Sequence, residues 1–301
     1  MWVLFSVVAC VFSVGNAILN KVCSLHTNSY LSATIKSLFM VIFTFAIVAI
    51  FGHIPDLVLL NQTEIIFIIV AGLLTTINWI CYFAAIKRSK LDLFAPFNET
   101  ALLAISNGLF AIFITTNVMN VESWISISLY VVGLLILVVA LIYILINKKM
   151  NDGINRKWLI FGFLSTTAYA VCLLFVKMYL SPIHADVVSF WQMVIVFVCC
   201  AIISIFVKGY RDLPKLKLLD WGKFALCALC NAAFVISRYQ AYSYSDGIPS
   251  ITNIIVSFAF VIVSMCTAIY LKKHEKKEII IISCLVLVGM LLEFGAGLFI
   301  K

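Results

Sequence analysis

Two segments of the sequence share a pattern: residues 122–133 read ESWISISLYVVG and residues 278–289 read EIIIISCLVLVG. Glu278 follows Glu122 by 156 positions, and Gly289 follows Gly133 by the same number. One such match in an apolar chain is weak evidence, but further pairs share the spacing: Lys21 and Lys177, Ala33 and Ser189, Lys36 and Gln192, Ala85 and Ala241, Ser89 and Ser245. A common spacing across separate segments predicts that the chain contains one structural pattern twice.

The composition predicts a membrane protein. Hydrophobic residues make up 64% of the 301 residues and charged residues only 11%, too few to cover the surface of a soluble domain. Apolar runs of about 20 residues recur, and that length of helix crosses the hydrocarbon core of a bilayer. Helices are expected because each satisfies its own backbone hydrogen bonds in lipid. The ten expected spans of this all-α protein are 2–22, 29–51, 63–86, 92–115, 123–147, 157–179, 184–207, 220–242, 247–271 and 277–300.

The basic residues fall in alternate loops. Lysine and arginine are concentrated in four of them: 87–91, 148–156, 208–219 and 272–276. The connections between these contain neither residue: 52–62, 116–122, 180–183 and 243–246. Basic loops stay cytoplasmic, so the alternation predicts that both termini lie outside the cytoplasm, in a plasma (inner) membrane. The net charge of +8 is therefore an orientation signal and does not indicate nucleic-acid binding.

The repeat is expected to be inverted. The first five-helix repeat covers residues 1–147, a basic cytoplasmic linker covers 148–156, and the second repeat covers 157–301. Because five is an odd number of crossings, the second repeat enters the membrane in the opposite orientation. Secondary transporters with this layout bind their substrates between the two halves.

No metal, cofactor or catalytic site is expected. Cys227 and Cys230 form a CxxC spacing, but no second pair or nearby histidine completes a metal site. The four histidines lie at helix ends or in loops, and nothing in the sequence groups them: His26, His53, His184 and His274. Motifs for a serine nucleophile, an acidic metal site or a phosphate loop do not occur. The sequence therefore gives no support to an enzyme.

Two charged residues lie inside expected spans of the first repeat. Lys36 in the second span and Glu99 in the fourth are both expected roughly 10 Å deep in the same leaflet. A charge inside a span costs about 2.5–3.5 kcal/mol on insertion scales and is a candidate functional group. The two side chains could form a structural ion pair, or they could bind substrate or a proton. Lys21 and Lys177, which close the first helix of each repeat, are expected to reach the membrane surface.

Prolines mark corresponding helix starts in the two repeats. Pro96 lies just inside the fourth span and Pro249 just inside the ninth, and alignment of the two segments sets Glu99 against Asn253. A proline near a helix start can free backbone carbonyls, and matched interruptions in two halves indicate a binding site. The alternative is an ordinary proline at a helix N-terminus. Asn98, beside Glu99, and Asn253 are therefore candidate binding residues.

A second set of polar residues is expected nearer the outside of the membrane. Arg238 lies towards the outer end of the eighth span and Glu293 towards that of the tenth, so a contact between them is plausible. Trp191 and Gln192 enter the seventh span from the same side. Gln192 holds the repeat position of Lys36, so the two halves differ in charge where a substrate could be recognised.

Aromatic residues gather on the third and eighth spans. Trp79 and Tyr82 have the i, i+3 spacing of one helix face, and Trp79 is too deep for an interfacial belt. Tyr239 lies in the corresponding part of the eighth span. These side chains either pack the helices together or form an aromatic wall for an amphipathic or cationic metabolite.

With these features the sequence resembles the EamA-type transporters of the drug/metabolite transporter superfamily over essentially its whole length. The resemblance rests on the two five-helix repeats, on the lysines that close each first helix, on Tyr82-Phe-Ala-Ala-Ile before Pro96, and on the repeated glutamate–glycine pattern. It implies a central cavity lined by the first four helices of each repeat, with a peripheral fifth helix and alternating access. The chain departs from the family pattern at Lys36, where arginine is common, and at Glu99, where apolar residues are usual.

We therefore expect a secondary active transporter of a small polar metabolite, either an amino acid or an amine, and the resemblance favours export. Uptake of a choline-like quaternary amine and flipping of a lipid carrier are the alternatives. The expected partners are the small-molecule substrate, a coupling proton or ion, and the lipid bilayer, with a homodimer as a further candidate. The expected binding residues are Lys36, Trp79, Tyr82, Asn98, Glu99, Trp191, Gln192, Arg238, Tyr239 and Asn253.

Overall fold

The computed structural model describes the chain except for residues 118–123, 147–156, 180–182, 245–248, 269–272 and 299–301. The described part contains ten long helices, one for each expected span, so the all-helical fold is confirmed. The expected linker 148–156, with Glu122 and Ser245, lies outside the described residues. The long helices are α1 (Trp2–His26), α2 (Ser29–Phe51), α3 (Gln62–Arg88), α4 (Leu91–Asn117), α5 (Trp124–Ile146), α7 (Lys157–Tyr179), α8 (Ala185–Phe206), α9 (Leu218–Tyr244), α10 (Pro249–Ala268) and α11 (Lys273–Leu298), and the short 3₁₀ helices are η1 (Pro55–Leu57) and η2 (Gly209–Lys215).

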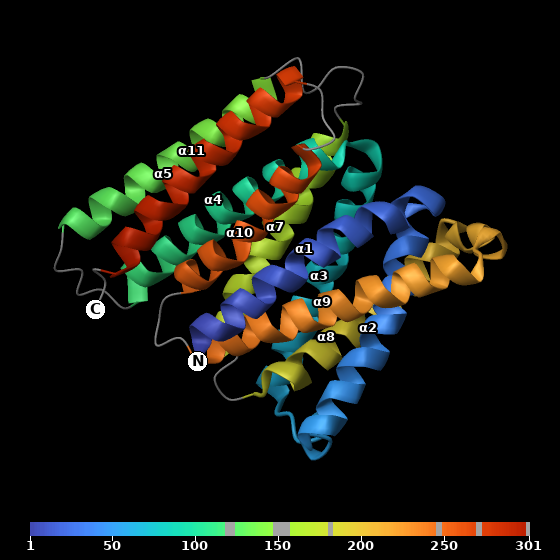
Figure 1. Ribbon diagram of the computed structural model, residues 1–301. Helices are drawn as coiled ribbons and strands as arrows, with labels where there is room; N and C mark the ends of the chain where they lie inside the picture. Colours follow the sequence, from blue (N-terminus) through green and yellow to red (C-terminus); the bar gives the residue numbers. More distant parts are fainter. Residues whose placement is uncertain (118–123, 147–156, 180–182, 245–248, 269–272, 299–301) are drawn as a thin grey trace.

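The two halves interlock. Helix α1 packs on α9, and α3 packs on α7, which is the same contact repeated with the halves exchanged. The counterpart helices also meet each other, because α2 packs on α8, α4 on α10 and α5 on α11. Figure 1 shows α5 and α11 side by side at one edge of the molecule, away from α2 and α8. This pattern of contacts is that of two similar units related by an approximate two-fold axis.

One pair of lysines repeats its contact in both halves. Lys21 Nζ donates to the carbonyl oxygens of Ile86 and Ser89 at the end of α3, both at 2.6 Å. Lys177 Nζ donates to the carbonyl oxygen of Tyr242 near the end of α9 at 2.9 Å, and Tyr242 is the repeat counterpart of Ile86. The last carbonyls of a helix lack partners within the helix, and a cation at this end also complements the helix dipole. The repeated lysines therefore tie the first helix of each half to the third.

Glycines allow α5 and α11 to approach closely. A Cβ atom on Gly133 would lie 2.9 Å from the carbonyl oxygen of Gly289, and one on Gly289 would lie 3.1 Å from the carbonyl oxygen of Gly133. Small residues at such crossings let membrane helices pack backbone to backbone. The glutamate–glycine pattern of the sequence thus contributes its glycines to the contact between the two fifth helices.

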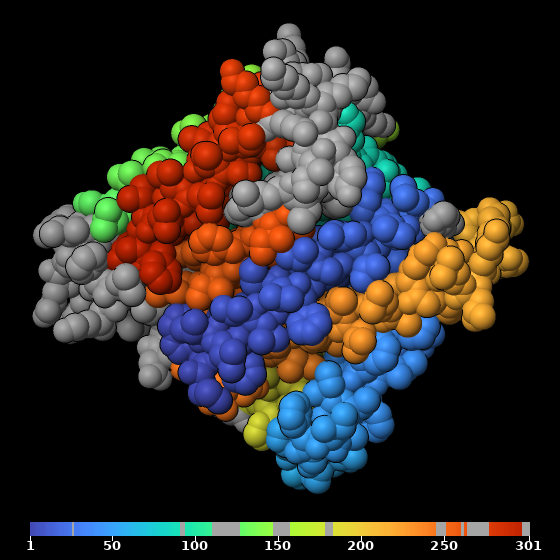
Figure 2. Space-filling view, in the orientation of Figure 1, coloured from blue at the N-terminus to red at the C-terminus, as the bar shows by residue number. Residues whose placement is uncertain are grey.

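The outer surface is apolar, as expected for helices in lipid. On α1 the exposed side chains of Val3, Leu4, Val7 and Val11 follow helical spacing, and Figure 2 shows α1 on the surface between α9 and α10. Counted over the described residues, eight helices contain an apolar stretch long enough to cross a membrane. The chain is therefore a polytopic membrane protein.

In both repeats a proline lies near the start of the fourth helix. Pro96 lies inside α4, which runs from Leu91 to Asn117, so this proline does not end the helix. Pro249 is the first described residue of α10, and residues 245–248 before it lie outside the described part of the chain. The expectation that the two prolines mark matched interruptions therefore stays a prediction.

Candidate binding cavity

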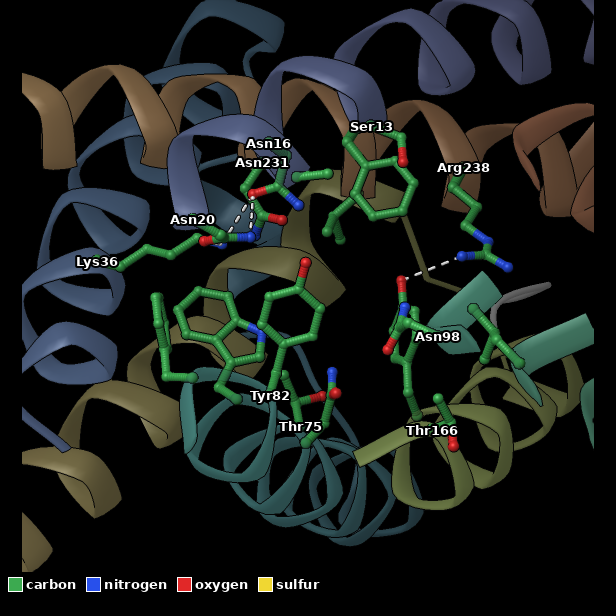
Figure 3. A pocket seen from close by; sticks show the side chains of 18 of the residues that line it. Ser13, Asn16, Asn20, Lys36, Thr75, Tyr82, Asn98, Thr166, Asn231 and Arg238 are labelled. Atoms are coloured by element: carbon green, nitrogen blue, oxygen red, sulfur yellow. Dashed lines mark hydrogen bonds between the residues drawn. The ribbon is translucent and has the colours of Figure 1, made fainter. Parts of the chain in front are cut away.

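A polar cavity lies between the two halves. It encloses about 780 Å³, including space open to its surroundings, and helices α1 to α4 and α7 to α9 contribute its walls. Figure 3 shows Lys36 and Arg238 on opposite sides of it, with Tyr82, Thr75 and Asn98 between them. The chain is 64% hydrophobic, and a concentration of polar side chains around one internal cavity of such a chain indicates a binding site.

The ammonium group of Lys36 is held by two neutral amides. Lys36 is 3% exposed, and its Nζ donates to Asn16 Oδ1 and to Asn20 Oδ1, both at 2.9 Å. The same Nζ lies 4.5 Å from the centre of the Trp79 ring, within the range of a cation–π interaction. Asn16 and Asn20 are four residues apart on α1 and therefore lie on one helix face. These contacts orient the charge without neutralising it.

The guanidinium of Arg238 is fixed by three neutral groups. Its Nη2 donates to Asn253 Oδ1 at 2.5 Å, its Nη1 to the Tyr169 hydroxyl at 3.3 Å, and its Nε to the Tyr242 hydroxyl at 3.3 Å. Arg238 is only 1% exposed. A guanidinium has five N–H donors, so three bonds leave two donors for another partner. These contacts hold the plane of the guanidinium while part of its fork remains available.

Glu99 supplies the negative charge of the cavity. Its Oε1 accepts from Asn98 Nδ2 at 3.2 Å, and its Oε2 lies at the 3.5 Å limit from the hydroxyl of Ser257. Arg238 is near enough to interact with this carboxylate electrostatically, although the two groups are not bonded. Glu99 is thus weakly held by its own chain.

Neither of the two ion pairs that the sequence allows is present among the described residues. Among the described residues no salt bridge joins Lys36 to Glu99, because Lys36 turns to α1. Glu293 does not contact Arg238 directly. It accepts from Asn107 Nδ2 at 2.5 Å, and Asn107 Oδ1 in turn accepts from Asn253 Nδ2 at 3.4 Å. The two charges are therefore connected through two amides, with Asn253 bonded to the guanidinium.

Gln192 is part of a separate hydrogen-bonded group. Its Nε2 donates to the Thr75 hydroxyl at 2.6 Å, and its Oε1 accepts from the Tyr239 hydroxyl at 2.8 Å. Gln192 is fully buried, and Tyr239 is 1% exposed. Because both ends of the amide are bonded, this group joins α3, α8 and α9 in a fixed geometry on the cavity wall.

Eight of the ten expected binding residues line this one cavity: Lys36, Trp79, Tyr82, Asn98, Glu99, Gln192, Arg238 and Tyr239. Two do not. Asn253 lies behind Arg238 and bonds to it, and Trp191 donates its indole N–H to the carbonyl oxygen of Leu57 at 3.1 Å. Both side chains orient other groups and do not face the cavity. The structure therefore does not support Trp191 as a binding residue, and Asn253 can contribute only by orienting Arg238.

Other lining residues were missed from the sequence. The polar ones are amides and hydroxyls, namely Ser13, Asn16, Asn20, Thr75, Asn78, Thr166, Tyr169 and Asn231. The spacing of Asn16 and Asn20 within an apolar helix was a usable signal, because two amides on one face of a span require partners. The single asparagines and threonines offered no such signal, since a helix can satisfy a lone hydroxyl by itself.

Two of the histidines meet outside the cavity, although nothing in the sequence grouped them. The imidazole rings of His53 and His184 are stacked with centres 3.9 Å apart. His53 Nδ1 lies 2.8 Å from Asp186 Oδ2, and His184 Nε2 lies 3.8 Å from Asp56 Oδ2. No sequence pattern indicated this contact, which forms because the turn after α2 reaches the N-terminus of α8.

Comparison with known proteins agrees with the fold. The model of the EamA-like transporter family matches residues 1–139 and again residues 156–294. A solved structure titled "Crystal structure of protein" is 13% identical, with 99% of this chain and 98% of that one covered and a TM-score of 0.67. At this identity the likeness concerns the fold alone. Among curated proteins, none matches the chain.

Proposed function

The chain belongs to the EamA-like transporter family, and from that premise we propose that it is a secondary active transporter of amino acids, which bind in the central cavity between the halves. Export by alternating access, with a proton or ion as the coupling partner, is part of the proposal. The observation that carries it is the presence in one cavity of two cations and an anion that make no salt bridge among the described residues.

Unpaired charges inside a membrane protein are costly and need a partner. A zwitterion supplies both signs at once. In the proposed pose the substrate carboxylate accepts from the two remaining N–H donors of Arg238, a geometry that suits a guanidinium fork. Its ammonium group lies against Glu99, which is near Arg238. An α-amino acid carries an ammonium group and a carboxylate on one carbon atom, so it can contact two opposite charges that do not bond to each other.

We propose that Lys36 contacts the side chain of the bound amino acid. It lies across the cavity from Arg238 (Figure 3), beside Trp79 and the amides of α1. With Arg238 and Glu99 occupied by the zwitterion, Lys36 retains its positive charge. An amino acid whose side chain ends in a carboxylate or carbonyl oxygen would complement that charge, so such substrates are favoured over basic ones.

A quaternary amine is a weaker candidate. An aromatic wall recognises such a cation through the faces of its rings, but the Trp79 face already holds Lys36 Nζ at 4.5 Å. A second cation at that face would meet a like charge within the cavity. Glu99 alone does not outweigh the two basic groups.

The decisive experiment is counterflow with purified protein in liposomes, because exchange requires neither a known coupling ion nor a known direction. Liposomes are loaded with single unlabelled amino acids, and entry of the labelled amino acid is measured. We expect exchange of one or a few amino acids, and no exchange of the matching decarboxylated amine or deaminated acid. Equal exchange of the amine, or exchange of none of the twenty amino acids, would refute the proposal.

Variants connect the result to the cavity. Glu99→Gln preserves the size of the side chain and removes its charge, so exchange should fall at least tenfold. Glu64→Gln, at a half-exposed site at the start of α3, is the matched control; glutamine can keep the side-chain contact with the Asn61 N–H group, so exchange should be unchanged. Full exchange by Glu99→Gln would show that the ammonium group binds elsewhere.

A further inference from the structure

A cluster of imidazoles and carboxylates lies at one end of the bundle, apart from the cavity. His53 follows the end of α2 and Asp56 lies in η1, both in the first half. His184 directly precedes α8 and Asp186 lies in its first turn, both in the second half. The loops at this end carry no lysine or arginine, so the charge pattern of the sequence predicts that it faces away from the cytoplasm.

Three of these side chains are placed as metal ligands are. His53, Asp56 and His184 each offer one ligand atom, and the three atoms all lie within 4.8 Å of one another. Tetrahedral zinc with bonds of about 2.0–2.1 Å needs ligand atoms about 3.3 Å apart. The side chains are 27%, 40% and 59% exposed for His53, Asp56 and His184, respectively. Modest side-chain rotation, including a tilt of the stacked rings, would bring the atoms together, and an ion could enter from the solvent.

The surroundings orient the ligands. Asp186 is 4% exposed and bonds to His53 Nδ1, which leaves the other ring nitrogen, Nε2, as the atom for a metal ion. A carboxylate on the second nitrogen of a histidine is the usual support of a metal-binding imidazole. Trp191 bonds to the carbonyl oxygen of Leu57, the residue after Asp56, and so fixes η1 against α8. The position of Trp191 outside the cavity is explained by this contact.

At the opposite end of the α2–α8 pair, the two halves are joined without imidazole ligands. At the spacing of the repeat, Asn28 corresponds to His184, Asp212 to Asp56 and Gly209 to His53. There Asn28 Nδ2 donates to Asp212 Oδ2 at 2.9 Å and to the carbonyl oxygen of Gly209 at 2.8 Å. One amide thus joins the two halves directly. At the other end two imidazoles and a carboxylate stand in the same places, and His184 Nε2 and Asp56 Oδ2 remain 3.8 Å apart.

We propose that His53, Asp56 and His184 form a binding site for a divalent transition-metal ion of the zinc class, with Asp186 as the group that orients His53 and with water as the fourth ligand. Two imidazoles and one carboxylate favour zinc over calcium and magnesium, which take oxygen ligands. Because the ligands come from both halves, a bound ion joins α8 to the end of α2.

Zinc binding to the purified, tag-free protein in detergent tests the site, measured by competition with a chromophoric zinc chelator. Wild type should bind zinc and should ignore magnesium and calcium. His184→Ala should abolish this binding, and Asp186→Ala should weaken it about 10- to 100-fold, as loss of an orienting group does. Asp212→Asn, at the equivalent place on the other end, is the control and should bind as wild type does. Equal zinc affinity of wild type and His184→Ala would overturn the proposal, because the ion would then be held elsewhere, for example by cysteine thiols.

A consequence for regulation rests on the proposed transport function. If the two halves move during transport, an ion that joins them should inhibit counterflow. Zinc should therefore reduce exchange by wild type and by Asp212→Asn, but not by His184→Ala. Zinc binding measured without substrate separates the two proposals, because zinc can bind whether or not the protein transports amino acids. Equal zinc inhibition of His184→Ala would refute the regulatory role.

Discussion

Two repeat positions compare the halves of the cavity directly. Lys36 in α2 corresponds to Gln192 in α8, and Tyr82 in α3 corresponds to Arg238 in α9; all four line the cavity. When the segments that begin at Asp92 and Asp246 are aligned, Glu99 in α4 is matched by the neutral Asn253 in α10, which lies behind Arg238. Equivalent backbone positions thus carry a charge in one half and a neutral group in the other. The helix packing is therefore symmetric between the two halves, whereas the side chains that could recognise a substrate differ between them.

The largest effect is expected from Arg238→Lys, because a lysine cannot reproduce the three fixed contacts or offer a fork to a carboxylate. Loss of hydrogen bonds to a charged group, about 1.5–3 kcal/mol each, should reduce exchange about 10- to 150-fold in the counterflow assay. Arg211→Lys, on the exposed surface, should exchange normally. Normal exchange by Arg238→Lys would mean that point charge alone suffices at this position.

Exchanging the charge between the halves tests whether its place matters. Lys36→Gln combined with Gln192→Lys keeps the composition of the cavity but moves the cation to position 192. There its neighbours are the hydroxyls of Thr75 and Tyr239, which bond to the two ends of the Gln192 amide. We expect exchange to stay roughly tenfold or more below wild type, since the amides of Asn16 and Asn20 no longer orient the cation. The rate of exchange at fixed substrate concentration measures this. Recovery to the wild-type rate would show that the two positions are interchangeable.

Lys36→Gln alone should separate binding from stability. Removing a buried charge that has only neutral partners is expected to leave the protein as stable or more stable. The KM for the exchanged substrate should rise several-fold. The unfolding temperature in detergent and KM check the two effects, with Lys217→Gln on the exposed surface as the control. A lower unfolding temperature with unchanged KM would assign Lys36 to the framework instead.

The framework itself should respond symmetrically. Lys21→Gln and Lys177→Gln each remove a contact to the end of a third helix, at a cost of about 1.5–3 kcal/mol for a hydrogen bond of a charged group. Similar shifts of the unfolding temperature are expected for both variants. A large shift of the unfolding temperature for only one of the two variants would show that the two lysine contacts do not stabilise the halves equally.

The smallest effect concerns the end opposite the histidines. Lys215 and Asn28 lower the pKa of Asp212 below its ordinary value, so the folded state prefers the carboxylate. Its small stabilising effect is present above the unfolded pKa, about 3.9, and is lost as the pH falls through the lower folded value. Asp212→Asn should therefore lower the unfolding temperature slightly at pH 7, and the difference should shrink as the pH falls below the unfolded pKa and through the lower folded value. Because the Asp212 side chain is 25% exposed and lies next to solvent, a large shift would contradict the assignment.

Several features of the site followed from local sequence and several did not. The positions of Lys36 and Glu99 inside the spans could be predicted because their distance from the helix ends sets their depth. Their partners could not, because either side chain can reach several helices, and Lys36 bonds to α1 in its own half. The link from Glu293 to Arg238 runs through Asn107 and Asn253, and no sequence spacing indicates such a chain of amides.

The sequence by itself determined the helices, their number and the repeat, because apolar length and a constant spacing are written along the chain. It also determined the resemblance to a transporter family, and the glycines where α5 and α11 meet follow from the repeated pattern of 122–133 and 278–289. Only the tertiary structure decided which charges share a cavity, why Trp191 lies outside it, and that His53 meets His184. Those contacts join residues more than a hundred positions apart, and the packing of the two halves brings them together.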